Sequence, residues 1–180
     1  MKKRAASPDI TFGNRFGKCD EFVLGFLHVA LMIRFLKYWA PPLLWAILIS
    51  YFSTDSFSFT KTATYLDPWL QWLFPAMSAE GMEWINAAVR KLGHLTEFFV
   101  FALFLGRAFR SSTHESLRLR WALWTLLIIG FYAGADEIHQ LFVVSRTASV
   151  KDSLLDFFGG CCAVFMIFAQ SKTHPRYNPN

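Results

Sequence analysis

The sequence has few charged residues and few cysteines for its length. Asp, Glu, Lys and Arg make up only 17% of the 180 residues, whereas about 25% is usual in soluble domains. Three cysteines are present, and two of them, Cys161 and Cys162, are adjacent in an apolar run. Their odd number and this placement argue against a disulfide framework. No short apolar core with a cleavage site follows the basic N-terminus, so no cleavable signal peptide is expected.

Hydrophobic residues are abundant instead. They make up 54% of the chain, and aromatic residues make up 18%, with 20 Phe and 7 Trp. The net charge of +5 does not indicate nucleic-acid binding, because the basic residues are distributed between apolar runs and do not form one basic face. The composition therefore predicts an all-α membrane protein with no nucleic-acid partner.

Four segments are apolar and long enough to suggest membrane-spanning helices. They cover about residues 38–53, 95–109 (extended backward to 84), 121–142 and 153–169. The first is expected to hold Pro41 and Pro42 in its opening turn, because proline is tolerated in the first turn of a helix. Residues 21–36 are also apolar, but His28 and Arg34 interrupt them. We expect an interfacial helix there rather than a fifth span, and hence a polytopic bundle of four transmembrane helices with an N-terminal interfacial helix.

The distribution of Lys and Arg predicts the orientation of these spans. With the N-terminus inside, the N-terminal arm holds seven of the 18 basic residues, the loop between spans two and three holds four, and the C-terminal tail holds two. This bias favours cytoplasmic N- and C-termini. The expected organisation is a basic cytoplasmic arm with the interfacial helix over residues 1–37, a transmembrane domain over 38–170 and a polar cytoplasmic tail over 171–180.

The segment between the first two spans, about residues 54–90, carries an aromatic and apolar patch that includes Tyr65, Trp69 and Trp72. Trp and Tyr favour the headgroup level of a membrane. The patch predicts a segment that lies on the outer leaflet, and a cap packed on the bundle is the alternative.

Ionisable residues meet the apolar spans at three places. Such residues are expensive at membrane depth, so a cluster of them is a candidate functional site. The three groups are Arg90, Lys91, His94 and Glu97 in span two, Asp136, Glu137, His139 and Gln140 at the end of span three, and Arg146, Lys151, Asp152 and Asp156 around the start of span four. Under the predicted topology all three converge on the outer side.

Helical spacing predicts which of these side chains face the same way. Residues three or four apart share a helix face, so Asp136 is expected to share one with His139 and Gln140. Glu137 is turned by about 100° from Asp136. Gly159 and Gly160 follow in span four, and small residues allow a neighbouring helix to approach closely.

A structural interpretation of the same residues also remains open. Residues near helix ends can be interfacial anchors, and Asp152 can cap the last span or complement its dipole. The deeper residues His94, Glu97, Asp136 and Asp156 can form an ion-pair network that holds the bundle together.

The order and spacing of these residues resemble the VanZ-like family, named after a teicoplanin resistance protein. The matching residues are Lys91, Gly93, His94, the run Asp136-Glu137-Ile138-His139-Gln140-Leu141-Phe142, Arg146, Asp152, Asp156 and Gly159. The resemblance covers about residues 40–170, with Phe98 where the family often has Tyr and Val144 where it often has Pro. It implies a small multi-pass protein of the bacterial inner membrane and, for the founding member, reduced sensitivity to a lipoglycopeptide antibiotic. It implies no agreed biochemical reaction.

Three functions fit this pattern. The first is binding of an anionic lipid-linked or cell-envelope precursor headgroup at the outer leaflet, with basic side chains facing phosphate. Its candidate ligand-binding residues are Lys91, Gln140, Arg146, Asp152 and Asp156. The second is an integral-membrane enzyme that uses acid-base chemistry, with His94, Glu97, Asp136, Glu137 and His139 as the catalytic candidates. The third is a small proton-coupled transporter, since intramembrane Asp, Glu and His carry protons in such proteins.

No cofactor is expected from the sequence, and a metal-dependent enzyme is one variant of the second function. A lipid phosphatase is a weaker variant, because Asp152 stands where the nucleophilic His of such enzymes would follow Ser145 and Arg146. Carboxylate and His residues three apart on a helix serve di-metal sites in helix bundles. The metal-ligand candidates at that spacing are His94, Glu97, Asp136 and His139. Lys91 and Arg146 would add positive charge beside them. The expected partner is a membrane lipid or a lipid-linked envelope precursor, and a homo-oligomer is left open.

Overall fold

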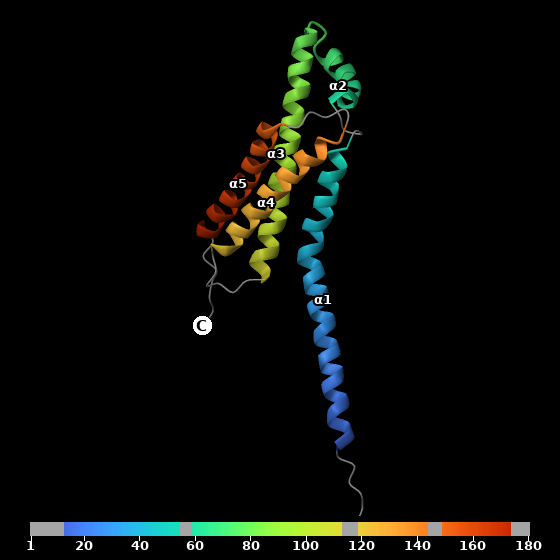
Figure 1. Cartoon of the computed structure of the whole chain (residues 1–180), viewed down its shortest axis with the longest axis vertical. Coiled ribbons are helices and arrows are strands. Elements are labelled where there is room, and N and C mark those ends of the chain that lie inside the picture. The colour runs from blue at the N-terminus through green and yellow to red at the C-terminus, as the bar shows by residue number, and fades with distance from the viewer. Residues whose placement is uncertain (1–12, 55–58, 113–118, 144–148, 174–180) are drawn as a thin grey trace, which may run out of the picture. The chain divides into compact units, whose positions relative to one another are not determined.

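The computed structural model describes residues 13–54, 59–112, 119–143 and 149–173 (Figure 1). The described residues form helices and no strand, so the all-α prediction is confirmed. The helices are α1 (Gly13–Phe52), α2 (Phe59–Leu73), α3 (Ala79–Ser112), α4 (Arg120–Gln140) and α5 (Val150–Thr173). The chain divides into two compact units, Met1–Lys37 and Tyr38–Asn180, and α1 contributes to both.

The first unit contains the N-terminal part of α1. Its described side chains from Leu24 onward are exposed and mostly apolar. They belong to one apolar stretch, Leu24–Phe52, that is long enough to cross a membrane. A separate interfacial helix over residues 21–36 is therefore wrong, because no glycine, proline or polar run ends the helix before the predicted first span.

Pro41 and Pro42 lie inside α1, not in its first turn as expected from the sequence. A proline removes one backbone donor from the helix. Membrane helices tolerate this loss, because neighbouring helices and small local adjustments satisfy the backbone groups that it leaves. The two prolines therefore do not end the apolar helix that runs through them.

Among the described residues, three helices are long and apolar enough to cross a membrane. The stretches are Leu24–Phe52 of α1, Ala79–Ser111 of α3 and Val150–Gln170 of α5. The chain is therefore a multi-pass membrane protein. The predicted set of four spans and an interfacial helix is corrected to these three, since Arg120 at the start of α4 and Asp136 to Gln140 at its end leave a shorter uncharged stretch between them, residues 121–135.

In the second unit, α3, α4 and α5 lie side by side, and α3 packs against both of the others (Figure 1). Their inward faces bury an apolar core that also includes Ile49 of α1. Its buried members are Ile49, Phe98, Phe101, Ala102, Leu105, Ile129, Ala133 and Ala163. Large apolar side chains such as Phe131 and Phe165 are exposed on the outward faces, as expected for helices that contact lipid rather than water.

Hydrogen bonds join the C-terminal part of α1 to the helices of this core. The Trp45 indole Nε1 donates to the backbone carbonyl of Glu97 on α3 at 2.9 Å. The Tyr132 hydroxyl of α4 donates to the Ala46 carbonyl at 2.6 Å and lies 2.7 Å from the Ser50 hydroxyl. The contacts to the Glu97 and Ala46 carbonyls are partly buried, and they pair polar groups that would be costly to leave unpaired in a membrane.

Helix α2 packs against the N-terminal part of α3. The Asn86 side-chain Nδ2 donates to Asp67 Oδ1 at 2.6 Å, and Leu70 is buried. The aromatic side chains of Tyr65 and Trp69 remain exposed. Helix α2 therefore packs on α3, and its exposed aromatic side chains keep the outer-leaflet interpretation as a prediction.

Candidate functional site

Two adjacent glycines set how closely α5 approaches its neighbours. A Cβ atom on Gly159 would lie 2.5 Å from the backbone oxygen of Leu95 on α3, and one on Gly160 would lie 2.7 Å from Cγ2 of Ile129 on α4. Neither distance is compatible with non-bonded contact, so the helices can approach this closely only at glycine. The expected role of these glycines is confirmed, and the contact at Leu95 lies one residue from His94.

His94 of α3, Asp136 of α4 and Asp156 of α5 form the centre of the candidate site. One side-chain nitrogen or oxygen from each lies within 4.8 Å of those of the other two. His94 Nδ1 is 3.6 Å from Asp156 Oδ1. Asp156 is fully buried, Asp136 is 4% exposed, and the His94 side chain is 12% exposed. These residues, called the buried triad below, bring together the three groups expected from the sequence.

The carboxylate of Asp156 is the least satisfied group of the triad. Neither of its oxygens has a hydrogen-bond partner among the described residues. Asp136 is better supported, because its Oδ2 accepts a hydrogen bond from Gln140 Nε2 at 2.8 Å. The further acids Glu97, Glu137 and Asp152 lie close enough to Asp156 to add negative potential there. The centre of the site therefore gathers three buried carboxyl groups, those of Asp136, Glu137 and Asp156, and any negative charge on them must be compensated to be stable.

Glu137 has a contact that gives it a positioning role. Its Oε2 accepts a hydrogen bond from the backbone N–H of Ser149 at 2.5 Å, and the Ser149 carbonyl accepts one from the backbone N–H of Asp152 at 2.8 Å. Glu137 thus holds the point where α5 begins. Asp152 lies in the first turn of α5, where a negative charge is favourable at the positive end of the helix dipole.

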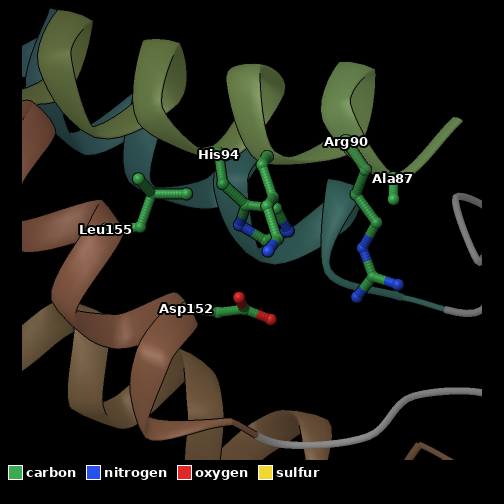
Figure 2. Close-up of a pocket in the computed structure, with 6 residues that line it drawn as sticks. Ala87, Arg90, His94, Asp152 and Leu155 are labelled. Carbon is green, nitrogen blue, oxygen red and sulfur yellow. The ribbon is translucent and has the colours of Figure 1, made fainter. Parts of the chain in front are cut away.

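A pocket of about 120 Å³ lies between α3 and α5, next to the triad. It is lined by Ala87, Arg90, Lys91 and His94 of α3 and by Asp152 and Leu155 of α5. The side chains of Arg90, His94 and Asp152 point into the same space (Figure 2). His94 belongs to both the pocket and the triad, so it connects a partly basic pocket with a buried acidic centre.

The other predicted site residues lie at different distances from this centre. Lys91 is exposed and lines the pocket, and Gln140 is buried. Glu97 is half-buried, almost one turn beyond His94 on α3. Arg146 lies outside the described residues, so its predicted role as a ligand for phosphate stays a prediction.

His139 lies apart from the triad. It is exposed, whereas Asp136, Glu137 and Gln140 are buried. The expected common face of Asp136 and His139 is therefore wrong. At about 100° per residue, the buried face runs from Asp136 through Gln140 to Glu137, and His139 falls on the far side of Asp136.

The sequence grouped Asp156 with His94, Glu97 and Asp136 as the deeper residues. The structure brings Asp156, rather than Glu97 or His139, together with His94 and Asp136. Leu155 and Ala87 line the pocket without a polar signal in the sequence. The spacing of four between Arg90 and His94, and between Asp152 and Asp156, is the signal that could have identified the α3–α5 surface.

Residues 38–170 match the sequence model of the VanZ/LLP1 family. Separate comparisons with curated proteins and with solved structures found no match. The family match covers most of the chain and includes every residue of the pocket and of the buried triad. The chain therefore belongs to the VanZ/LLP1 family.

Proposed function

We propose that this VanZ-like membrane protein binds the anionic headgroup of an envelope lipid, or of a lipid-linked envelope precursor, in the pocket between α3 and α5. The observation that carries the proposal is the gathering of Arg90, Lys91 and His94 around one pocket on a helix long enough to cross a membrane. Three potential cations around a small pocket favour an anion as its ligand.

The positions of basic residues along α3 support a pocket that lies at the depth of the lipid headgroups. Arg90 and Lys91 lie in its first half, and Arg107 and Arg110 lie near its end. At 1.5 Å per residue, the two pairs are about 24 to 30 Å apart, close to the thickness of the hydrocarbon core, about 30 Å. Because long basic side chains favour the two polar boundaries, one pair belongs at each face of the membrane.

The pocket lies toward the outer leaflet of the bacterial inner membrane if the N-terminus is cytoplasmic, as the Lys and Arg bias favours. The span in α1 then ends, and the span in α3 begins, on the outer side. Helix α4 packs beside α3 and α5. Between Arg120 and the polar run at its end, its exposed side chains are apolar, and they include Leu123, Leu127 and Phe131. Its polar Thr125 is buried and donates to the Trp121 carbonyl at 2.8 Å.

The lining residues have complementary tasks toward a phosphorylated headgroup. The Arg90 guanidinium matches two phosphate oxygens, and the Lys91 ammonium adds a point charge. Asp152, on the other side of the pocket, can orient these cations and accept from sugar hydroxyls or amines. The exposed Tyr65 and Trp69 of α2 favour the headgroup level, which supports a ligand held close to lipid.

Binding to a polyprenyl phosphate tests this proposal, with the uncharged polyprenol as the comparison. The detergent-solubilised protein should bind the phosphate and not the alcohol. The double variant Arg90→Gln/Lys91→Gln should lose at least about tenfold in affinity, since hydrogen bonds to charged groups contribute about 1.5 to 3 kcal/mol each. Lys61→Gln, an exposed basic residue of α2 outside the pocket, is the matched control. Equal affinity of the double variant and wild type would refute the proposal.

The family also implies a role in lipoglycopeptide resistance, which we extend to this chain as part of the proposal. Cells that express the wild-type protein should tolerate more teicoplanin than cells that express the Arg90→Gln/Lys91→Gln variant. Immunoblotting of membranes must show equal amounts of the two proteins. Equal tolerance at equal expression would show that resistance does not depend on headgroup binding by Arg90 and Lys91.

A second candidate function is an integral-membrane enzyme that acts on such a headgroup. The position of His94 favours this function. His94 lines the pocket, and its Nδ1 lies 3.6 Å from Asp156 Oδ1. A carboxylate beside an imidazole can orient it as a general base. Release of phosphate from a polyprenyl diphosphate by wild type, and not by His94→Gln, would support an enzyme. Binding without turnover would leave the binding function alone.

A further inference from the structure

We propose that the buried triad of His94, Asp136 and Asp156 binds one divalent transition-metal ion, Zn²⁺ or Mn²⁺. One donor atom from each of three different helices lies within 4.8 Å of the other two. The metal site stands on these residues and does not depend on the headgroup proposed for the neighbouring pocket.

The charge balance of the triad is the first argument. Asp156 is fully buried, and neither of its oxygens has a hydrogen-bond partner among the described residues. Asp136 is 4% exposed and lies beside it. An uncompensated buried carboxylate is strongly unfavourable, and two neighbouring ones repel each other as well. A divalent cation between them would neutralise both charges and give the Asp156 oxygens a partner.

The spacing of the donor atoms is the second argument. In a tetrahedral site with bonds of about 2.0 to 2.2 Å, neighbouring ligand atoms are roughly 3.3 to 3.6 Å apart. His94 Nδ1 and Asp156 Oδ1 already lie 3.6 Å apart. The donor atoms of the triad all lie within 4.8 Å of one another. A separation of 4.8 Å must shorten by roughly 1.2 Å to reach 3.6 Å, and side-chain rotation is sufficient for a movement of this size.

The support around Asp136 is the third argument. Gln140 is 1% exposed and donates from Nε2 to Asp136 Oδ2 at 2.8 Å. A hydrogen bond of this kind orients a carboxylate ligand, and its loss typically lowers metal affinity by about 10- to 100-fold. The other carboxylate oxygen of Asp136 stays available for the ion.

The chemistry of the donors selects the class of metal. An imidazole nitrogen suits Zn²⁺ and other first-row ions, whereas carboxylates also suit Mn²⁺. Three protein ligands leave at least one coordination position open, as in catalytic zinc sites. Positive charge from Lys91 and Arg146 argued against a metal from the sequence alone. Lys91 is exposed and is not part of the triad, and Arg146 lies outside the described residues. Because His94 also lines the pocket, the open position would be available to an anionic ligand there, a step that does rest on the proposed function.

Metal analysis of the purified protein tests the site. Protein without a histidine tag is incubated in detergent with ZnCl₂ or MnCl₂, freed of unbound ions by gel filtration, and measured by elemental mass spectrometry. We expect about one ion per chain for wild type and a loss of at least about tenfold in affinity for Asp136→Asn and Asp156→Asn. Glu83→Gln, an exposed acid on the same helix as His94, is the matched control and should bind as wild type does.

A second measurement keeps the test decisive if an Asn variant fails to fold. Wild-type protein loaded with metal should unfold at a lower temperature after treatment with a chelator, and recover when the ion is returned, because a ligand that binds only the folded state stabilises it. No bound ion and no effect of the chelator would overturn the proposal. The Arg90→Gln/Lys91→Gln variant should keep its metal while losing polyprenyl phosphate, so failure of the metal site and failure of headgroup binding are distinguishable.

Discussion

The contact between Gly159 and Leu95 makes the strongest prediction about this structure. A Cβ atom at position 159 would lie 2.5 Å from the Leu95 backbone oxygen and 3.3 Å from its carbonyl carbon. Carbon–oxygen contacts in proteins are rarely shorter than about 3.3 Å. Gly159→Ala should therefore force α3 and α5 apart by roughly 0.8 Å at this point, because the obstacle is backbone and has no side-chain rotamer to change.

The size of the effect follows from two opposing contributions. Overpacking of a well-packed interior costs about 1 to 3 kcal/mol, while alanine is favoured over glycine in a helix by about 1 kcal/mol. Gly93→Ala isolates the second contribution, because nothing lies within 4 Å of a Cβ atom at Gly93 on α3. Gly159→Ala should be less stable than Gly93→Ala by about 1 to 3 kcal/mol. In a chain of this size that corresponds to roughly 2 to 12 °C in Tm.

Thermal unfolding of both variants in the same detergent measures this difference. The separation of the helices should also weaken the site, because Asp156 lies on α5 less than one turn before Gly159 and opposite His94 of α3. Metal affinity and polyprenyl phosphate binding should therefore fall in Gly159→Ala and stay unchanged in Gly93→Ala. If the two alanine variants unfold at the same temperature and bind equally well, the glycine contact does not set the distance between α3 and α5, and the reasoning is refuted.

Two further contacts make predictions of their own. Tyr132→Phe removes the hydroxyl that contacts the Ala46 carbonyl and Ser50, so it should lower the free energy of unfolding by about 0.5 to 1.5 kcal/mol. An unchanged unfolding temperature in detergent would show that these hydrogen bonds contribute nothing to stability. Glu137→Gln should weaken the hydrogen bond from the Ser149 backbone N–H, because a neutral acceptor is weaker than a charged one. Hydrogen exchange at the start of α5 should become faster while metal binding is retained, and loss of metal binding without faster exchange would instead make Glu137 a ligand.

Local sequence patterns were sufficient for much of the fold. The long apolar runs predicted membrane helices, since a helix is the simplest way to satisfy backbone hydrogen bonds in hydrocarbon. They did not predict that α1 continues through Pro41 and Pro42, because the cost of a proline depends on what surrounds the helix. Nor did they predict that α4 falls outside the three candidate spans, because Arg120 at its start and Asp136 to Gln140 at its end confine its uncharged stretch to residues 121–135.

The candidate site divides in the same way. The residue types and spacings in α3, α4 and α5 determined by themselves that acids and bases would gather in a membrane protein of this family. Only the tertiary structure decided that Asp156 joins His94 and Asp136 while His139 faces outward. Periodicity relates residues on one helix to each other, but the side of that helix that is buried depends on where its neighbours lie. Here that depends on long-range packing, in particular on the close approach of α5 to α3 at Gly159.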